Sequence, residues 1–251
     1  MISLPTKPAI IKHEGNNAVF EITQLYPGYG VTLGNVLRRI LLSSLPGAAV
    51  TEVKIRNIDH EFTSIPGVKE NVVDLLLNVK KLRFRVNGNE PQNVKLEVKG
   101  ERKVSGVDLE APGQVEVVST QEHIATLTDK KAELYMELTV ESGVGYLPVE
   151  MRKKEKLSVG NISVDAIFTP VRKVNFSVEN MRVGDRTDYN RLILEIETDG
   201  TISPENALIG AATILVEQAA AIADWSLPPR EGLELKTLSD GVAKKTKRSK
   251  K

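Results

Sequence analysis

A glycine-rich stretch near the N-terminus is the part of the sequence whose spacing comes nearest to a known chemistry. Gly28, Gly30 and Gly34 lie between an expected strand and an expected helix, and Glu52 follows about where a ribose-binding acid would stand. Such a turn can bring backbone N–H groups against the phosphates of a dinucleotide. However, the strand before it alternates instead of being wholly apolar, and the later chain lacks strand-helix-strand repeats. A dinucleotide-dependent enzyme using loop 28–34 is therefore an alternative and not the main hypothesis.

The remaining polar residues give little basis for catalysis or metal binding. The chain has no cysteine, and its three histidines, His13, His60 and His123, lie far apart without metal-ligand spacing. No Ser/His/Asp grouping and no phosphate-cradling Gly-Lys-Thr sequence is present. We therefore expect no catalytic residue, no metal site and no cofactor on this chain.

Two adjacent arginines, Arg38 and Arg39, are more informative. Neighbouring helix positions point about 100° apart, so the two side chains cannot share one partner. Arginines on a helix are often simply solvated, but apolar residues occupy most of this helix, and at least one arginine must emerge at the edge of a buried surface. Planar guanidinium groups suit the rims of protein interfaces. The pair favours a protein–protein contact.

Charge is distributed unevenly along the chain. The net charge is +1, yet the C-terminal residues 244–251 are strongly basic. The rest of the chain is therefore mildly acidic and poorly suited to binding nucleic acid. The basic residues of this tail are Lys244, Lys245, Lys247, Arg248, Lys250 and Lys251. Such an end is typical of a disordered tail that aids solubility, and a nucleic-acid-binding module acting through it is the second alternative. It would touch phosphates weakly and without specificity.

Neither a membrane span nor a signal peptide is expected. No apolar run approaches the roughly 20 residues that a span requires, and the N-terminus has no long apolar stretch. Charged residues make up 27% and apolar residues 41%, which are ordinary values for a globular protein. We expect a cytoplasmic protein, with a plastid as the alternative location.

The glycine loop and the arginines must be positioned by the first helix. A half-exposed strand over residues 18–23 precedes it, Thr32 is expected to cap it, and Pro46 and Gly47 end it after about Ser44. Its apolar residues cover more than half of its circumference: Leu33, Val36, Leu37, Ile40, Leu41, Leu42 and Leu45. One sheet buries only a single stripe, so a second burying surface is required, and a partner helix is the natural candidate.

The middle of the chain predicts an antiparallel, strand-rich body. A strand is expected over residues 51–58, and residues 64–67 open a second helix with Val68, Val72, Leu75, Leu76 and Val79 at helical spacing. From about Leu82 to Thr198 the apolar residues mostly alternate, and turns rich in Gly, Asn, Asp and Pro separate the runs.

A last helix begins with Ser203 as cap and Pro204 at its first position. A three-four spacing follows, which is typical of a coiled-coil-like seam: Leu208, Ala211, Leu215, Gln218, Ile222 and Trp225. Small residues along the helix allow another backbone to approach closely. This helix is expected to pair with another and to end at Pro228 and Pro229.

Two stretches resemble a known family. The segment VTLGNVLRRILLSS at residues 31–44, followed by PG at 46–47 and AVTEV at 49–53, closely resembles the start of the bacterial RNA polymerase alpha subunit. The segments RTD at 186–188, EIETDGTI at 195–202 and AATIL at 211–215 resemble the same family's return to its dimerisation helix. With GYLP at 145–148 and VDA at 164–166, the resemblance spans roughly residues 5–228.

The resemblance implies an α+β fold with two subdomains. A discontinuous dimerisation subdomain with an antiparallel sheet and two long helices would comprise residues 1–47 and 173–229, an inserted strand-rich subdomain residues 48–172, and a disordered basic tail residues 230–251. The helices of two copies would then pack together in a homodimer. The expected interface residues are Leu33, Val36, Leu37, Ile40, Leu41, Leu208, Ala211, Leu215 and Ile222.

The resemblance also implies partners and their binding residues. One copy would bind the beta subunit through Gly34, Asn35, Arg38 and Arg39. The other would bind the beta-prime subunit through Arg182, Arg186 and Asp188. Magnesium and nucleotides would belong to those large subunits, and this chain would be a non-catalytic assembly scaffold that meets DNA only through the complex.

The sequence departs from the family's pattern at its end. Typical members continue through a linker into a helical C-terminal domain that binds promoter DNA, whereas this sequence stops in its lysine-rich tail. We therefore expect the DNA-binding function of that domain to be absent, unless the sequence is truncated.

Overall fold

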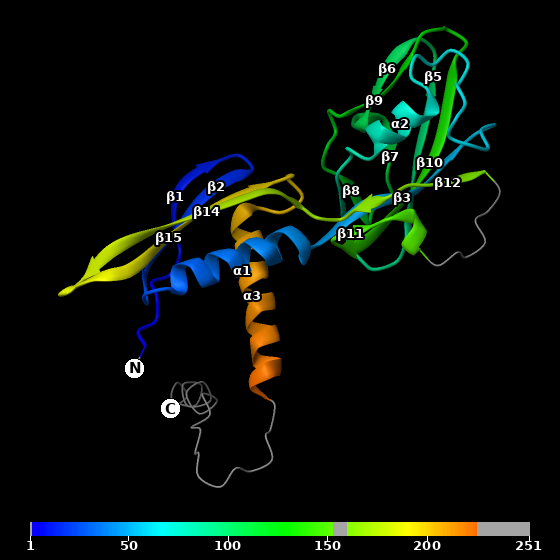
Figure 1. Ribbon diagram of the computed structural model, residues 1–251. Coiled ribbons are helices and arrows are strands. Elements are labelled where there is room, and N and C mark those ends of the chain that lie inside the picture. Colours follow the sequence, from blue (N-terminus) through cyan, green and yellow to red (C-terminus); the bar gives the residue numbers. More distant parts are fainter. Residues whose placement is uncertain (1, 153–159, 225–251) are drawn as a thin grey trace, which may run out of the picture. The chain divides into compact units, whose positions relative to one another are not determined.

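The structure is a computed structural model that describes residues 2–152 and 160–224 of the chain. Three α-helices and two larger antiparallel sheets account for most of it, which confirms the predicted α+β class (Figure 1). The basic tail, Trp225 and the prolines expected to end the last helix lie outside the described residues.

The first sheet joins segments from the two ends of the chain. Its four strands, in spatial order, are β1 (Ala9–Glu14), β2 (Asn17–Leu25), β15 (Arg186–Thr198) and β14 (Val171–Val183). β2 and β15 are antiparallel neighbours, with Phe20 opposite Leu194 and Ala18 opposite Ile196. Because side chains alternate between the faces of a strand, these residues share one buried face. We call this sheet, with helix α1 (Tyr29–Ser43) and helix α3 (Pro204–Ala223) up to residue 215, the end-built part.

Helix α1 (Tyr29–Ser43) packs on β14 and β15 (Figure 1). It begins earlier than predicted, because Gly28 is the cap residue, with φ 86°, and the Thr32 hydroxyl donates a hydrogen bond to the Gly28 carbonyl from inside the helix. The prediction of Thr32 as the cap is therefore wrong. A threonine hydroxyl inside a helix can bond back one turn, which its sequence position alone does not distinguish from capping.

Strand β3 (Pro46–Ile55) also begins earlier than predicted. Pro46 and Gly47 end the helix as expected but at once enter the strand, because β10 (Glu133–Val144) pairs with β3 along its whole length up to Val144 opposite Pro46. Pro46 lies at the very start of β3, where its missing N–H is least disruptive.

The second sheet lies within what we call the strand-rich part, residues 46–169. Its strand order is β12 (Asn161–Ser163), β3, β10, β5 (Gln92–Lys99) and β7 (Leu109–Glu110). Short strand pairs flank it: β4 (Phe84–Val86) with β8 (Val115–Val117), β6 (Arg102–Ser105) with β9 (His123–Leu127), and β11 (Tyr146–Leu147) with β13 (Ala166–Ile167). Two short 3₁₀ turns, Gly106–Asp108 and Val149–Met151, complete it.

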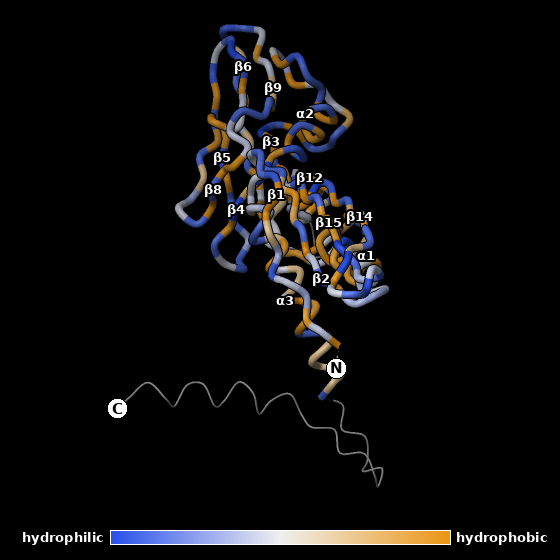
Figure 2. The backbone as a smooth tube through the Cα atoms, turned by 90° about the vertical axis from the view of Figure 1, so that its left-hand side faces the viewer, coloured by the Kyte–Doolittle hydropathy of each residue, from blue (hydrophilic) through white to orange (hydrophobic). Residues whose placement is uncertain are grey.

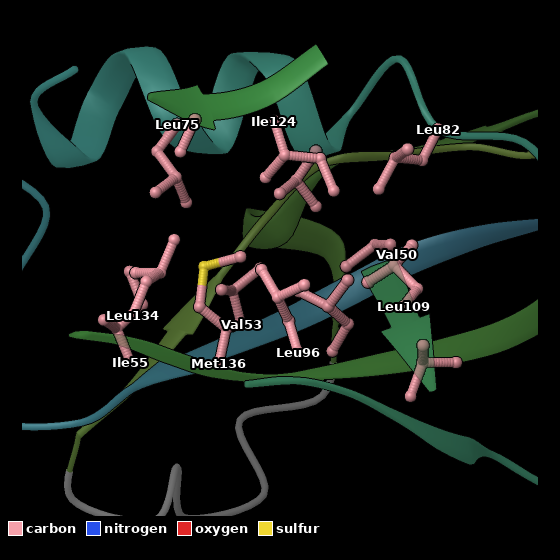
Figure 3. Packing of buried hydrophobic residues seen from close by; sticks show 14 of the residues in the cluster. Val50, Val53, Ile55, Leu75, Leu82, Leu96, Leu109, Ile124, Leu134 and Met136 are labelled. Atoms are coloured by element: carbon pink, nitrogen blue, oxygen red, sulfur yellow. The ribbon is translucent and has the colours of Figure 1, made fainter. Parts of the chain in front are cut away.

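Helix α2 (Val72–Val79) covers the core of the strand-rich part. Figure 3 shows Leu75 of α2 above Met136 and Leu134 of β10. The prediction that residues 64–67 open this helix is wrong, since Asn71 caps it by accepting a hydrogen bond from the Asp74 N–H at 2.7 Å. The preceding Val68 instead forms a β-bridge with Leu127, at which the Lys69 N–H donates to the Thr126 carbonyl and the Thr128 N–H donates to the Gly67 carbonyl.

Helix α3 (Pro204–Ala223) begins as predicted. The Ser203 hydroxyl accepts a hydrogen bond from the Asn206 N–H at 3.2 Å. The chain divides into two units between Leu215 and Val216, so that α3 crosses their boundary. Its buried residues, Pro204, Ala207, Leu208 and Ala211, all belong to the first unit, and residues 216–224 are exposed.

The same helix overturns one sequence prediction. Contrary to the expectation that no apolar run approaches the length of a membrane span, α3 has the length and composition of one, with a mean hydropathy of 1.5 and only 17% of its most apolar window buried. Alanines and a glycine between the larger apolar residues extend the apolar run. Most of α3 is accordingly coloured toward the hydrophobic end of the scale in Figure 2. Much of the apolar surface of α3 is therefore not covered by the described part of the same chain.

Candidate functional site

The glycine-rich turn before α1 is already occupied by a side chain of the same chain. The Gly28 and Gly30 N–H groups donate to Oδ1 of the buried Asn190 at 2.9 and 3.2 Å. The Asn190 side chain in turn donates to the Asn180 side chain at 3.4 Å. Because α1 has no cap from its own N-cap side chain, Asn190 of β15 provides the acceptor that a helix N-terminus needs.

The glycines inside α1 serve close packing. A Cβ atom on Gly30 would lie 2.7 Å from Cγ1 of Val178, and one on Gly34 would lie 2.6 Å from Cδ2 of Phe176. No side chain fits at these distances, so glycine lets α1 approach the sheet. The amides that a phosphate would need are bonded to Asn190, and the geometry gives no support to a dinucleotide site.

The outer face of α1 carries the residues predicted to bind the beta subunit, with one exception. Asn35, Arg38 and Arg39 are exposed, and neither guanidinium forms an ion pair with any residue that the structure describes. Gly34 differs from them, because it is buried against Phe176 on the side of the helix that faces the sheet; its role in beta binding stays a prediction. The exposed arginines remain available to a partner.

The predicted dimer-interface residues fall into three groups. Leu37, Leu41, Leu208 and Ala211 are buried in the chain's own core, Leu33, Val36, Ile40 and Leu215 are half-buried, and Ile222 is 75% exposed. The first group has almost no surface left for a partner, because the seam spacing selected the stripe that packs on the sheet of the same chain. These four residues pack within one copy, and the dimer interface itself stays a prediction.

Two exposed residues of α3 were missed. Ile209 is 63% exposed and Val216 is 66% exposed, and they are seven residues apart on the same side of the helix. The three-four stripe of Leu208, Ala211 and Leu215 accounts for only part of the apolar residues of α3, and Ile209 and Val216 lie outside it. This excess of apolar residues over one stripe was the feature that could have identified them.

The residues predicted to bind beta-prime lie at the β14–β15 hairpin. Arg186 holds Asp188 with two hydrogen bonds, from Nε to Oδ1 at 3.0 Å and from Nη2 to Oδ2 at 2.7 Å. The Arg182 Nε atom donates to the Gly184 carbonyl at 2.8 Å. All three residues are exposed, so the hairpin presents a paired and oriented set of charges.

An aromatic group connects this hairpin to the start of α1. The Arg186 guanidinium lies 5.6 Å from the Tyr26 ring centroid and 5.4 Å from that of Tyr189, and these two rings meet edge to face at 6.1 Å. Hydrogen bonds from Arg186 hold the pKa of Asp188 below its ordinary value. The ion pair therefore persists at neutral pH and keeps the hairpin residues in place.

No metal site is found in the part of the chain that the structure describes. Among residues 2–152 and 160–224, no group of three or more His, Asp or Glu residues could hold an ion.

Comparisons with known proteins point in one direction. The profile of the family described as the RNA polymerase Rpb3/RpoA insert domain matches residues 53–169. The DNA-directed RNA polymerase subunit alpha of Roseiflexus sp. (strain RS-1) is 46% identical over 242 residues, which is 96% of this chain and 74% of the relative. The subunits of the same name from Roseiflexus castenholzii and Alkaliphilus oremlandii are 47% and 50% identical, covering 90% and 82% of this chain and 69% and 65% of each relative.

Proposed function

This chain belongs to the family of DNA-directed RNA polymerase alpha subunits, and we propose that it forms the homodimeric platform on which the beta and beta-prime subunits assemble. Residues 1–47 and 173–229 would form the dimerisation subdomain and residues 48–172 the inserted one. The chain would carry no active site, and nucleotides and magnesium would bind to the large subunits. The complex would work in the cytoplasm.

The uncovered apolar surface of α3 is the observation that carries the dimer. Ile209, Val216 and Ile222 are each more than 60% exposed. Exposed apolar area of this extent on one helix marks an interaction site, and permanent dimers cover such surfaces. A bilayer is a poorer environment, because Glu217 lies inside the helix and a charge in the hydrocarbon core is unfavourable by about 2.5 kcal/mol or more. A second copy can leave Glu217 in water.

Arg38 and Arg39 support the contact with the beta subunit. Both are exposed on α1, outside the stripe of buried residues that packs on the sheet. Guanidinium groups without an internal carboxylate partner offer several donors at low desolvation cost. Arg182, Arg186 and Asp188 support a separate contact with beta-prime from the hairpin.

Sedimentation tests the dimer. We expect the purified chain to sediment as a dimer at micromolar concentration and Ile209→Asp to sediment as a folded monomer, since an unpaired charge would enter the interface. Val107→Asp is the matched control, because Val107 is 64% exposed but lies in the strand-rich part. A dimeric Ile209→Asp variant would contradict the assignment.

Capture tests the partner. With the beta subunit from the same genome as bait, Arg39→Ala is expected to remain dimeric and to lose roughly tenfold or more in affinity. Lys103→Ala, which removes another exposed cation, should bind as the wild type does. Equal capture of Arg39→Ala and Lys103→Ala would place the beta contact elsewhere.

A further inference from the structure

The turn between β15 and α3, residues 199–203, is held by two arginines from the strand-rich part. Arg83 immediately precedes β4 and Arg85 lies within it. Both reach the turn that leads directly into the first turn of α3, more than 110 residues further along the chain. This contact is therefore a tertiary connection between the strand-rich part and the start of α3.

Arg83 is the buried member. Its Nε atom lies 3.1 Å from Oδ2 of Asp199, an ion-pair contact without the alignment of a hydrogen bond, and only 19% and 4% of the two side chains are exposed. Its Nη1 atom donates to the carbonyls of Lys80 and Leu82, each at 3.0 Å. The guanidinium thus joins the end of α2 to Asp199.

Asp199 in turn shapes the turn. Its Oδ1 atom accepts hydrogen bonds from the Thr201 N–H at 3.0 Å and the Thr201 hydroxyl at 2.6 Å. Its own N–H donates to the Pro170 carbonyl at 2.9 Å. Gly200, which lies between Asp199 and Thr201, adopts φ +96°, a backbone conformation that favours glycine. One carboxylate therefore fixes both the turn and its attachment to Arg83.

Arg85 contributes from the surface. Its Nε atom donates to the Thr201 carbonyl at 3.0 Å, while Nη1 pairs with Glu116. Its side chain is 45% exposed, so solvent screens this contact. The buried Arg83–Asp199 pair is the stronger constraint.

Burial makes this pair sensitive to the loss of either member. Burial lowers the pKa of the Arg83 guanidinium, and the charge of Asp199 opposes that effect. Arginine stays charged near neutral pH in any case. Removing one partner would leave the other charge buried without compensation, which is unfavourable unless the structure moves to admit water. The segment that Asp199 holds is the turn at the start of α3, so this is where the loss of the pair would act.

We propose that Arg83 and Asp199 form a lock through which the strand-rich part fixes the first turns of α3, so that the exposed face of α3 meets a second copy in one orientation. The fixed orientation toward a second copy rests on the proposed function, because it assumes the dimer. The hold on the first turns of α3 concerns a single copy and stands independently.

Amide exchange tests the lock in each copy. In Arg83→Met, the amides of Thr201, Ala207 and Leu208 should exchange about tenfold faster or more, while those of Leu138 and Val98 stay protected. Asp199→Asn, a milder change that keeps Oδ1 as an acceptor for Thr201, should show the same pattern more weakly. Arg83→Lys should restore part of the protection. Arg102→Met is the matched control, since Arg102 pairs with Asp108 inside the strand-rich part.

The dimer dissociation constant is the second measurement. We expect Arg83→Met to raise it about tenfold and Arg102→Met to leave it unchanged. A wild-type monomer would refute the proposed dimer but leave the exchange test of the lock valid. Unchanged exchange at Thr201, Ala207 and Leu208 in both Arg83→Met and Asp199→Asn would overturn the lock, and so would equally faster exchange throughout the chain in Asp199→Asn.

Discussion

The strand-rich part and the end-built part cover their helices to different degrees. Helix α2 is short, and Val72, Leu75 and Val79 are fully buried on the five-stranded sheet. Helix α3 is 20 residues long, and its buried residues stop at Ala211 while large apolar side chains continue beyond. Both parts therefore bury a core within one copy, but α3 carries three large apolar side chains, Ile209, Val216 and Ile222, that remain more than 60% exposed. The difference separates residues that stabilise the chain from residues available to a partner.

The largest expected effect comes from the two closed cores. Leu75→Ala in the strand-rich part and Leu41→Ala in the end-built part should each lower the free energy of unfolding by about 2–5 kcal/mol, because both side chains are fully buried and leave cavities. Urea denaturation measures the loss. Leu77→Ala, on the exposed face of α2, is the control and should change it by less than about 1 kcal/mol. A Leu41→Ala loss as small as the control would mean that the end-built core is not closed in one copy.

A smaller effect is expected where α1 approaches the sheet. Gly34→Ala should destabilise the chain by about 1–3 kcal/mol, because its Cβ would lie 2.6 Å from Phe176. Gly113→Ala has open space around it and should be nearly neutral in the same thermal unfolding experiment. Equal melting temperatures for the two variants would show that α1 can move away from the sheet at little cost.

The cap supplied by Asn190 is expected to contribute somewhat less. Asn190→Ala should lower the free energy of unfolding by about 1–2 kcal/mol and speed the exchange of the Gly28 and Gly30 amides. Asn190→Asp keeps an acceptor for both amides and should retain most of their protection. If Asn190→Ala leaves these amides protected, another group caps α1.

The smallest effect is a pH dependence in the strand-rich part. Burial alone would raise the pKa of Glu70, but hydrogen bonds from His123 and from the Thr126 N–H and hydroxyl outweigh it and hold the pKa below its ordinary value of 4.5. The stabilisation is then full above about pH 4.5 and is lost as pH falls through the lower folded pKa. Glu70→Gln should flatten this acid decline in thermal unfolding measured at several pH values. An unchanged decline would assign it to other carboxylates.

Local patterns allowed the sequence to predict much of the fold. Alternation identified β2, β5 and β15, and the Ser203-Pro204 pair located the start of α3, because a strand face or a helix cap is set by residues within a few positions. The family resemblance rests on motifs of the same local kind.

The misses have a common cause in contacts between distant segments. The acceptor for Gly28 and Gly30 lies on β15, 160 residues or more away, and the N-terminal extension of β3 depends on β10. On α3, Leu208 and Ala211 are buried in the chain's own core whereas Ile209 and Val216 are exposed, and this difference depends on how the helix packs on the rest of the chain. Spacing identified Leu208 and Ala211 as a seam but could not show that their partner is in the same copy.

Thiol labelling tests the central claim most directly, since the chain has no cysteine of its own. Val216 and Val107 are equally exposed in a single copy, at 66% and 64%. If a second copy covers α3, a cysteine in Val216→Cys should react with a thiol reagent much more slowly than one in Val107→Cys at micromolar protein, and the difference should shrink on dilution. Equal rates for the two variants at every concentration would contradict the account.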